Sequence, residues 1–271
     1  MKNAPWFAHY PKDVPQQIES AEYESLAELL NDSFKKFGNY PAFENMGKVM
    51  TFNELKTASD SFAAYLIHDL GLNRGDKVAI QMPNLLQYPV VLFGALRAGM
   101  TVVNVNPLYT SSELKHQLND ADAKVIIVLA NFANILEGIL SETKLKHVLV
   151  THIGDMIGGI KGSLINFAVK YVRKMVPSFS LPKATALMKA LKSGANHDFV
   201  QPPIKSSNLA FLQYTGGTTG VSKGAMLSHG NLVANLLQVN TWMKSGGLKE
   251  GAEVYITALP IYHIFALVAN V

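Results

Sequence analysis

The densest group of residues able to bind an anion lies between positions 214 and 224, in the run Tyr-Thr-Gly-Gly-Thr-Thr-Gly-Val-Ser-Lys-Gly. Glycines let the backbone turn tightly and present N–H groups to an anion, and Thr and Ser hydroxyls add further donors. Lys223 supplies a positive charge near the end of the run. The run follows an apolar, strand-like segment directly, which argues against a flexible linker. This composition predicts a loop that binds a triphosphate.

Three known motifs can be compared with this run. A Walker P-loop ends in Gly-Lys-[Ser/Thr], whereas here the order is Ser222-Lys223-Gly224, and the G-x-G of a Rossmann fingerprint occurs nowhere in the chain. The residues from Gly220 to Gly224 do match the G-x-S-x-G nucleophile elbow of α/β-hydrolases. An elbow leads from a strand into a helix, but strand-like residues follow here. A serine hydrolase with Ser222 as nucleophile therefore stays a minor alternative, with only Glu250 and Glu253 as acids between Ser222 and His263.

The elements that must position this loop alternate between helices and apolar strands. Capping-box pairs at Ser25/Glu28, Thr51/Glu54 and Thr110/Glu113 mark helix starts. Apolar periodicity predicts helices at about 26–37, 51–71, 84–98, 110–119, 131–140, 184–191 and 231–242, and strands at about 77–82, 101–105, 124–129, 146–151, 209–214 and 254–259. Because parallel strands need long crossover connections, this rhythm predicts an α/β fold with parallel sheets flanked by helices.

Composition excludes several classes of protein. The 271 residues contain no cysteine, so disulfide-stapled modules, thiolate zinc sites and cysteine nucleophiles are excluded. A hydrophobic content of 48% and a net charge of only +4 argue against disorder. No apolar run reaches the roughly 18 residues of a membrane span, and the N-terminus lacks a signal-type apolar core. These features predict a cytoplasmic globular protein.

Four stretches in order resemble the adenylate-forming (AMP-binding) enzymes, which include acyl-CoA synthetases, peptide-synthetase adenylation domains and luciferases. Residues 214–232 resemble the phosphate-binding signature of that superfamily, and the other three stretches are 50–55 (Met-Thr-Phe-Asn-Glu-Leu), 96–107 (Leu-Arg-Ala-Gly to Asn-Pro) and 259–265 (Leu-Pro-Ile-Tyr-His-Ile-Phe). The similarity runs from about residue 20 to the end. Residues 82–89 and 106–109 resemble bacterial long-chain fatty acid–CoA ligases in particular.

The resemblance implies a two-step ligase reaction. A fatty carboxylate would attack the α-phosphate of ATP to give acyl-adenylate and pyrophosphate, and the CoA thiol would then displace AMP. His263 would sit beside the acyl carboxylate and the α-phosphate, although its apolar surroundings alone would favour a buried structural histidine. The magnesium ion would lie near the Thr215 hydroxyl. The β- and γ-phosphates would be held by Thr215, Gly216, Gly217, Thr218, Thr219, Gly220 and Lys223.

The chain ends inside an apolar run, just after the His263 motif, which favours an incomplete N-terminal (AMP-binding) domain over residues 1–271. The resemblance implies that the adenine-, ribose- and lysine-bearing motifs lie beyond it, so we expect these residues alone to be inactive. An aryl- or amino-acid-activating relative is the main alternative, since most residues that select the acyl group would also lie beyond position 271. A non-catalytic membrane-associated fragment is a third class, and a homodimer is a further possibility.

A basic, insert-like segment at about 156–197 interrupts the α/β rhythm. No acidic residue occurs between Asp155 and Asp198, and without the seven basic residues there the other 17 of the 24 Lys and Arg are outnumbered by 20 Asp and Glu. This distribution argues against nucleic acid as a partner. Leu164, Ala168, Tyr171, Val172 and Met175 share one helical face, and Lys170, Arg173 and Lys174 lie near the opposite side. Such a helix either docks on the core or contacts an anionic membrane, which here would be the inner membrane.

Overall fold

The computed structural model describes residues 4–18, 22–215 and 222–270. Strands are β1 (Pro41–Asn45), β2 (Lys48–Thr51), β3 (Lys77–Gln81), β4 (Thr101–Asn104), β5 (Ala123–Leu129), β6 (His147–Thr151), β7 (Thr185–Ala186), β8 (Leu209–Thr215) and β9 (Lys223–Ser228). Helices are α1 (Leu26–Phe37), α2 (Phe52–Ala64), α3 (Gln87–Arg97), α4 (Ser111–Asp120), α5 (Ala133–Ile139), α6 (Gly159–Phe167), α7 (Leu187–Gly194), α8 (His229–Ser245) and α9 (Ile264–Asn270). Short 3-10 or π turns are η1 (Pro5–His9), η2 (Tyr65–Asp69), η3 (Ala130–Phe132), η4 (Leu140–Glu142) and η5 (Ala168–Val172).

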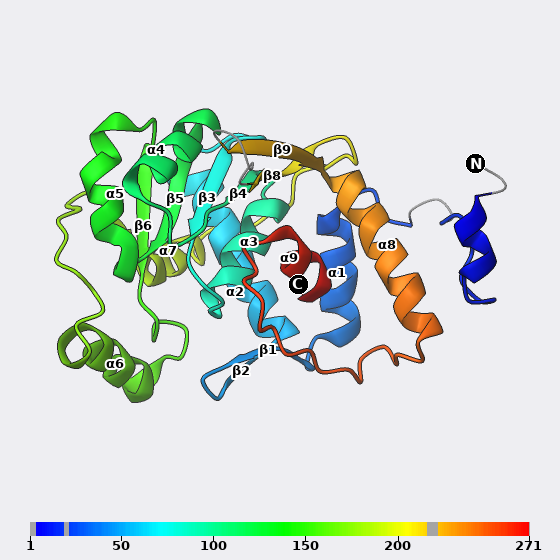
Figure 1. Ribbon diagram of the computed structural model, residues 1–271. Helices are drawn as coiled ribbons and strands as arrows, with labels where there is room; N and C mark the ends of the chain where they lie inside the picture. The colour runs from blue at the N-terminus through cyan, green and yellow to red at the C-terminus, as the bar shows by residue number, and fades with distance from the viewer. Residues whose placement is uncertain (1–3, 19–21, 216–221, 271) are drawn as a thin grey trace.

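Seven strands form one sheet in the order β7-β6-β5-β3-β4-β8-β9 (Figure 1). All neighbouring strands are parallel except β8 and β9, which form an antiparallel pair at one edge. The predicted α/β fold with a parallel sheet flanked by helices is therefore confirmed. β1 and β2 form a separate antiparallel hairpin, which the sequence pattern did not indicate.

Helices cover both faces of the sheet because neighbouring strand residues point to opposite sides. Val78 and Ile80 of β3 face the larger core, to which α1, α2, α3, α7, α8 and α9 contribute. Ala79 faces the smaller core, which α4 and α5 close. The central strands are buried on both faces, as parallel strands with helices on either side must be.

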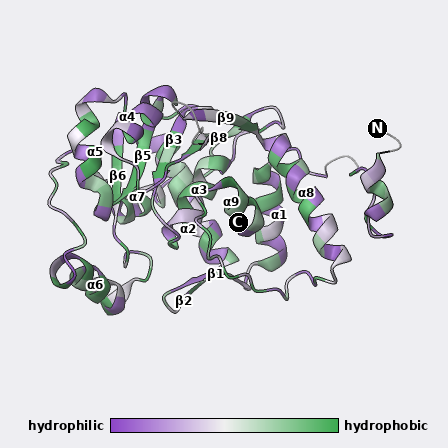
Figure 2. Ribbon diagram, in the orientation of Figure 1, coloured by the Kyte–Doolittle hydropathy of each residue, from purple (hydrophilic) through white to green (hydrophobic). Residues whose placement is uncertain are grey.

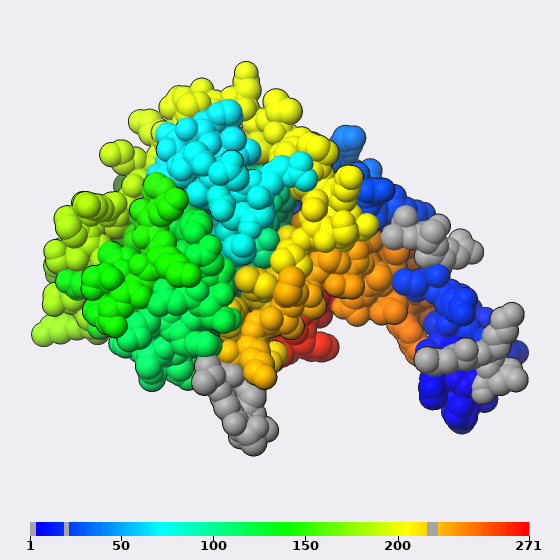
Figure 3. Space-filling model, turned by 90° about the horizontal axis from the view of Figure 1, so that it is seen from above, coloured from blue at the N-terminus to red at the C-terminus, as the bar shows by residue number. Residues whose placement is uncertain are grey.

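Local sequence signals set the helix starts as expected. The hydroxyls of Ser25, Thr51 and Thr110 accept hydrogen bonds from the backbone N–H three residues later, and the last two form complete capping boxes with Glu54 and Glu113. Such caps contribute about 1 kcal/mol each by satisfying amides that have no partner inside the helix. At the N-terminal end, the ring of Tyr10 packs edge-on against Trp242 of α8, which places η1 beyond that helix (Figures 1 and 3).

The strand predicted at 254–259 is wrong, because these residues form an irregular extended segment. A strand needs a hydrogen-bonding neighbour, and no described strand pairs with this one. Val254 and Ile256 are 92% and 89% exposed, so their apolar character is not satisfied by a sheet. The segment is instead held through its carbonyl groups, which accept hydrogen bonds from the side chain of Asn84.

The basic segment divides into two parts. Its second half adds β7 to the sheet and packs α7 on the larger core through Leu187 and Ala190, close to the predicted helix at 184–191. Its first half, α6 continued by η5, extends away from the sheet (Figure 1). Docking of this helix on the core through its apolar face is wrong, since Leu164, Tyr171, Val172 and Met175 are all exposed. Within the described ranges, no helix combines the length and the apolarity needed to cross a bilayer.

Candidate functional site

The predicted phosphate-binding run lies on the β8–β9 hairpin, at the carboxyl end of β8. Thr215 ends β8 and Lys223 begins β9, and the two residues are paired in register across the antiparallel ladder. Both are exposed. Gly216, Gly217, Thr218, Thr219 and Gly220, which the sequence also assigns to the phosphates, lie outside the described residues. The structure therefore places the two polar ends of the run side by side, at the carboxyl ends of the parallel strands, which is where α/β folds bind ligands.

Tyr214 forms a platform under one end of this hairpin. Its ring is buried against Gly224, where an added Cβ would lie 2.9 Å from ring carbons. Its hydroxyl donates a 2.5 Å hydrogen bond to Oδ2 of Asp120, at the end of α4. Burial, followed by this bond and the charge of Asp120, raises the pKa of the Tyr214 phenol well above its ordinary value. The phenol thus stays protonated and acts as a structural donor.

Helix α4 holds the other end of the hairpin as well. Nε2 of His116 lies 2.9 Å from the carbonyl oxygen of Ser222, immediately before Lys223; because a carbonyl oxygen only accepts, a proton on Nε2 donates this bond. His116 and Asp120 are four residues apart, so they lie on one face of α4. One face of α4 therefore contacts the candidate phosphate loop on both sides, at Tyr214 before it and at Ser222 near its end. Sequence reasoning missed both residues, because their partners Tyr214 and Ser222 lie 94 and 106 residues away in the sequence.

His263 lies at the start of α9 and is exposed, so the alternative of a buried structural histidine, which its apolar surroundings alone would favour, is wrong. Its backbone N–H donates to the carbonyl of Pro260, and its own carbonyl accepts from Leu267 in the first turn of the helix. The side chain is therefore free to meet a ligand from the N-terminal side of α9, where backbone N–H groups also point.

A buried chain of polar side chains links β8 to the His263 segment. The Tyr88 hydroxyl donates to Oδ1 of Asn104 (2.7 Å), and Nδ2 of Asn104 donates to Oε1 of Gln213 (3.0 Å). Nε2 of Gln213 then donates to the carbonyl of Tyr262 (3.0 Å). Gln213 precedes Thr215 by two residues and Tyr262 precedes His263 by one. These hydrogen bonds thus hold the β8–β9 hairpin and the His263 segment at the same end of the sheet.

Asn84 fixes the approach to His263 from another side. Its Nδ2 donates to the carbonyls of Thr257 (3.0 Å) and Leu259 (2.9 Å), and its Oδ1 accepts from the N–H of Ile261 (2.9 Å). One side chain thereby satisfies three backbone groups of an irregular segment that has no ladder of its own. Sequence reasoning did not single out Asn84, Asn104 or Gln213, because their partners are distant in sequence.

The geometry does not support a serine hydrolase. Ser222 leads into strand β9, whereas an elbow nucleophile leads into a helix. Glu250 forms an ion pair with Lys36 (2.7 Å), and a carboxylate oxygen of Glu253 accepts the backbone N–H of Lys249 (3.0 Å). Both acids available to a triad with His263 are thus engaged elsewhere.

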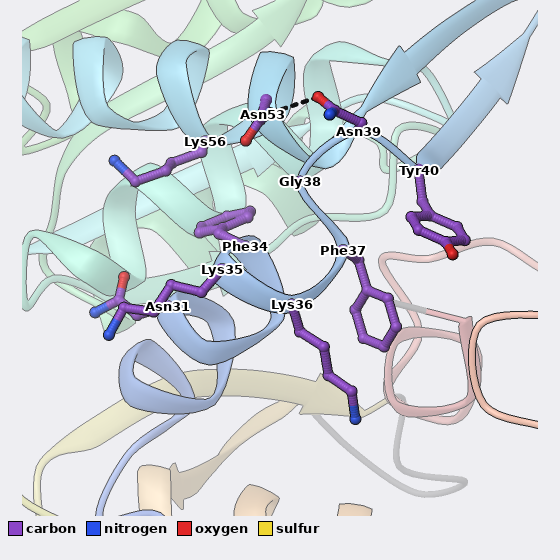
Figure 4. A pocket seen from close by; sticks show the side chains of 10 residues that line it. All are labelled: Asn31, Phe34, Lys35, Lys36, Phe37, Gly38, Asn39, Tyr40, Asn53 and Lys56. Carbon is purple, nitrogen blue, oxygen red and sulfur yellow. Dashed lines mark hydrogen bonds between the residues drawn. The ribbon is translucent and has the colours of Figure 1, made fainter.

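A cleft of about 620 Å3 between α1, the start of β1 and α2 contains none of the predicted site residues (Figure 4). Lysines 35, 36 and 56 line it, which could suggest an anion site. However, Lys36 pairs with Glu250 and Lys56 pairs with Asp60 at 2.6 Å, so two of the three positive charges that an anion would need are offset by carboxylates. The β8–β9 hairpin remains the candidate site.

Comparison with known proteins agrees with this arrangement. The chain is 52% identical over 265 residues to the long-chain-fatty-acid–CoA ligase of Salmonella typhimurium and 47% identical over 267 residues to that of Haemophilus influenzae. In both cases the match covers 98% of this chain and 47% of the relative, so the chain spans about half the length of these curated relatives. A long-chain-fatty-acid-CoA ligase from Archaeoglobus fulgidus superposes with a TM-score of 0.69 at 26% identity, covering 96% of this chain and 47% of that structure.

A second solved structure, ATP-bound MatB from Rhodopseudomonas palustris, superposes with a TM-score of 0.66 at 27% identity and covers 90% of this chain. A family model described as AMP-binding enzyme matches residues 30–271. That match includes the hairpin, α4, the polar chain through Gln213 and the His263 segment. The chain therefore belongs to the AMP-binding enzyme family.

Proposed function

We propose that this chain provides the triphosphate- and carboxylate-activating part of a long-chain fatty acid–CoA ligase. The observation that carries the proposal is the link from the β8–β9 hairpin, with exposed Thr215 and Lys223, through Gln213 to the His263 segment. Activation of a carboxylate by ATP needs a phosphate-binding group and a group near the reacting carboxylate, held in fixed relation. The relatives from Salmonella typhimurium and Haemophilus influenzae, 52% and 47% identical to this chain, are both long-chain-fatty-acid–CoA ligases, which supports the choice of substrate.

In the first step, a carboxylate oxygen of the fatty acid attacks the α-phosphorus of ATP, and the bond from that phosphorus to the bridging oxygen breaks. The products are acyl-adenylate and pyrophosphate. Negative charge grows on the departing pyrophosphate, so donors that hold its oxygens lower the barrier. Lys223 supplies a full charge and Thr215 a hydroxyl. We assign Gly216, Gly217, Thr218, Thr219 and Gly220 to the same phosphates from the sequence.

In the second step, the thiolate of CoA attacks the acyl carbon and AMP leaves with the electrons of the carbon–oxygen bond. His263 is proposed to donate a hydrogen bond to the carboxylate or α-phosphate oxygens and so to position them for both steps. Its exposed location at the start of α9 supports that role, because an acidic ligand oxygen is also favoured near a helix N-terminus.

Magnesium fits the residues present through Thr215. The described residues contain no group of three His, Asp or Glu side chains that could form a protein cage for a metal ion. Magnesium commonly keeps few protein ligands and binds substrate phosphates and water instead. A single Thr215 hydroxyl beside the proposed triphosphate site suits that pattern, and the ion would neutralise phosphate charge when bound.

The proposal extends to partners. The sequence expectation of contact between Lys170, Arg173, Lys174 and an anionic membrane is retained, because all three side chains are exposed. A homodimer and a cytoplasmic location are retained on the sequence alone. An aryl- or amino-acid-activating ligase is the second candidate, since the resemblance implies that most residues that select the acyl group lie beyond position 271.

Carboxylate-dependent exchange of pyrophosphate into ATP tests the proposal, using the longest polypeptide that the encoding reading frame provides. Exchange that depends on palmitate but not on benzoate or amino acids is the expected result, and the reverse order would establish the second candidate. Lys223→Met should raise the KM for ATP by about tenfold or more, because a charge-assisted bond contributes about 1.5–3 kcal/mol. Lys205→Met, a change at an exposed lysine outside the hairpin, should leave that KM unchanged.

A further inference from the structure

The helix formed by α6 and η5 carries an apolar stripe on the side that faces solvent. Ile160, Leu164, Phe167 and Tyr171 follow the i, i+4, i+7, i+11 spacing of one helix face and are 82%, 61%, 57% and 59% exposed. Figure 2 shows this helix largely in the green of hydrophobic residues, on an element that extends away from the sheet. An amphipathic helix of a globular domain ordinarily turns such a stripe to the core. Here the orientation is inverted.

The inverted orientation is built into the inner face of the helix. Gly162 is the buried residue of α6, and a Cβ there would overlap the carbonyl oxygen of Gly154. Asn166, one turn later, accepts the N–H of Gly154 (2.7 Å) and donates to Oδ1 of Asp155 (2.9 Å). A glycine and an asparagine thus attach the helix to the domain by close backbone approach and hydrogen bonds. Rotating the apolar stripe inward would break all of these contacts.

The tip of the β1–β2 hairpin lies beside the first turn of α6. Nζ of Lys161 donates a 2.5 Å hydrogen bond to the carbonyl of Met46, which adopts a left-handed φ of 51° in the turn. Met46 and Val49 are large apolar residues left exposed on this hairpin. Two elements that are far apart in the sequence therefore extend to the same side of the molecule (Figure 1). We call the exposed residues Met46, Ile160, Leu164, Phe167, Tyr171 and Val172 the apolar face.

The charged residues of the α6–η5 helix and of the two positions after it are all basic. Lys161, Lys170, Arg173 and Lys174 are exposed, and none of them forms an ion pair with a described carboxylate; the exposed acid Glu44 lies two residues before Met46 on the β1–β2 hairpin. A second copy of the chain would bring the same positive charge against this face and be repelled. A surface that is apolar inside and negative outside, such as a bilayer with anionic headgroups, complements both properties.

We propose that the apolar face inserts into the headgroup region of an anionic membrane, with α6 lying parallel to the surface. The inference rests on the membrane contact included in the proposed function, and goes beyond it by naming apolar insertion, the elements that insert and the inner contacts that hold them in that orientation. The flanking Lys161, Lys170, Arg173 and Lys174 then meet lipid phosphates, while their aliphatic stems lie along the apolar stripe.

Co-sedimentation with vesicles tests the proposal, in the absence of ATP and fatty acid and with the longest polypeptide of the reading frame. Vesicles of phosphatidylcholine with about one third phosphatidylglycerol should bind the protein, and phosphatidylcholine vesicles should bind it at least about tenfold more weakly. Ile160→Ser with Leu164→Ser and Phe167→Ser should weaken binding more than about tenfold, as should Lys170→Glu with Arg173→Glu and Lys174→Glu. These residues are exposed, so the variants should keep the unfolding midpoint of the parent protein.

Matched controls change the same residue types elsewhere. Leu108→Ser with Val200→Ser removes equally exposed apolar side chains, and Lys35→Glu with Lys205→Glu and Lys249→Glu reverses three exposed charges. Neither should change vesicle binding. If the variant with Ile160, Leu164 and Phe167 changed to serine binds vesicles like the parent, insertion by the apolar face is refuted. The same result is expected if another part of the longer polypeptide covers this face, and it refutes the proposal in that case too.

A spectroscopic reporter separates insertion from adsorption. Phe167→Trp should shift its fluorescence to shorter wavelength on addition of anionic vesicles, whereas Leu108→Trp should not. No shift at position 167 alongside charge-dependent sedimentation would mean adsorption only and would overturn the proposal. Pyrophosphate exchange in detergent, measured on the same variants, should be unchanged, so a failure of the membrane proposal is distinguishable from a failure of the ligase assignment.

Discussion

Replacing Gly224 with alanine is expected to weaken both the fold and the phosphate hairpin. The new Cβ would lie 2.9 Å from Cε2 and Cζ of Tyr214, whereas carbon atoms in contact prefer about 3.5–4.0 Å. The ring would have to move by at least about half an ångström. It cannot do so freely, since its hydroxyl is bound to Asp120 at 2.5 Å. Overpacking of this kind costs about 1–3 kcal/mol, and we expect about 2 kcal/mol for Gly224→Ala.

Urea unfolding with linear extrapolation measures this change. Gly138→Ala is the matched control, because a Cβ at Gly138 in α5 would meet nothing within 4 Å and alanine favours a helix. That control should be neutral or stabilising by up to about 1 kcal/mol. Gly224→Ala should also raise the KM for ATP in the longer polypeptide, because the displaced strand carries Lys223.

A double-mutant cycle tests the cause directly. Tyr214→Leu removes the two clashing ring carbons, and it leaves Asp120 exposed to water, where the carboxylate needs no protein partner. In that background Gly224→Ala should cost less than about 0.5 kcal/mol. In a Tyr214→Phe background the ring remains but its bond to Asp120 is lost, so the cost should lie between those in the parent protein and in the Tyr214→Leu background. Equal costs in the leucine and phenylalanine backgrounds would refute the steric argument.

Two further predictions concern a buried histidine and the His263 segment. Burial lowers the pKa of His229 from 6.5 to about 4, and its Nδ1 accepts the N–H of Leu26 at 3.3 Å, so the unfolded chain binds a proton first as the pH falls. Stability should be constant above about pH 7.5, where both states are unprotonated, and should fall by about 2 kcal/mol from there to about pH 5, as followed by urea unfolding. His229→Asn should flatten this dependence, and an equally steep slope in that variant would assign it to other groups. Asn84→Ala removes three hydrogen bonds from residues 257–261 and should speed amide exchange of Ile261 by about tenfold or more. The control Asn53→Ala removes a surface bond to Asn39 and should leave exchange at Ile261 unchanged. Unchanged exchange at Ile261 in Asn84→Ala would show that Asn84 does not hold the segment.

The elements that the sequence predicted well are those with local signals. The capping boxes at Thr51 and Thr110 and the apolar strands around β3, β4, β5 and β6 needed no knowledge of distant residues. The strand expected at 254–259 had the right composition, but a strand forms only with a neighbour, and composition does not supply one. The outward rotation of α6 depends on Gly162 meeting Gly154, which a helical periodicity cannot reveal.

The residues of the candidate site also separate into those with a local sequence motif and those that depend on distant partners. Thr215, Lys223 and His263 stand in recognisable motifs, so resemblance identified them. The groups that hold them, Asp120, His116, Gln213 and Asn84, act across sequence separations of 94, 106, 49 and 173 residues or more. A single sequence carries no signal for such pairs beyond the polar type of each residue.

The position of β8 in the sheet has a consequence for the order in which this chain folds. β8 lies beside β4, and the bond from Asn104 to Gln213 joins residues 109 apart. At about 5–20 residues per second, a ribosome would need about 5–20 seconds to make the chain between them. During that interval β4 presents an unpaired edge, and unpaired edges recruit other strands. Nascent chains should therefore depend on a chaperone, or on rapid synthesis of the residues between β4 and β8, until β8 emerges and closes the edge.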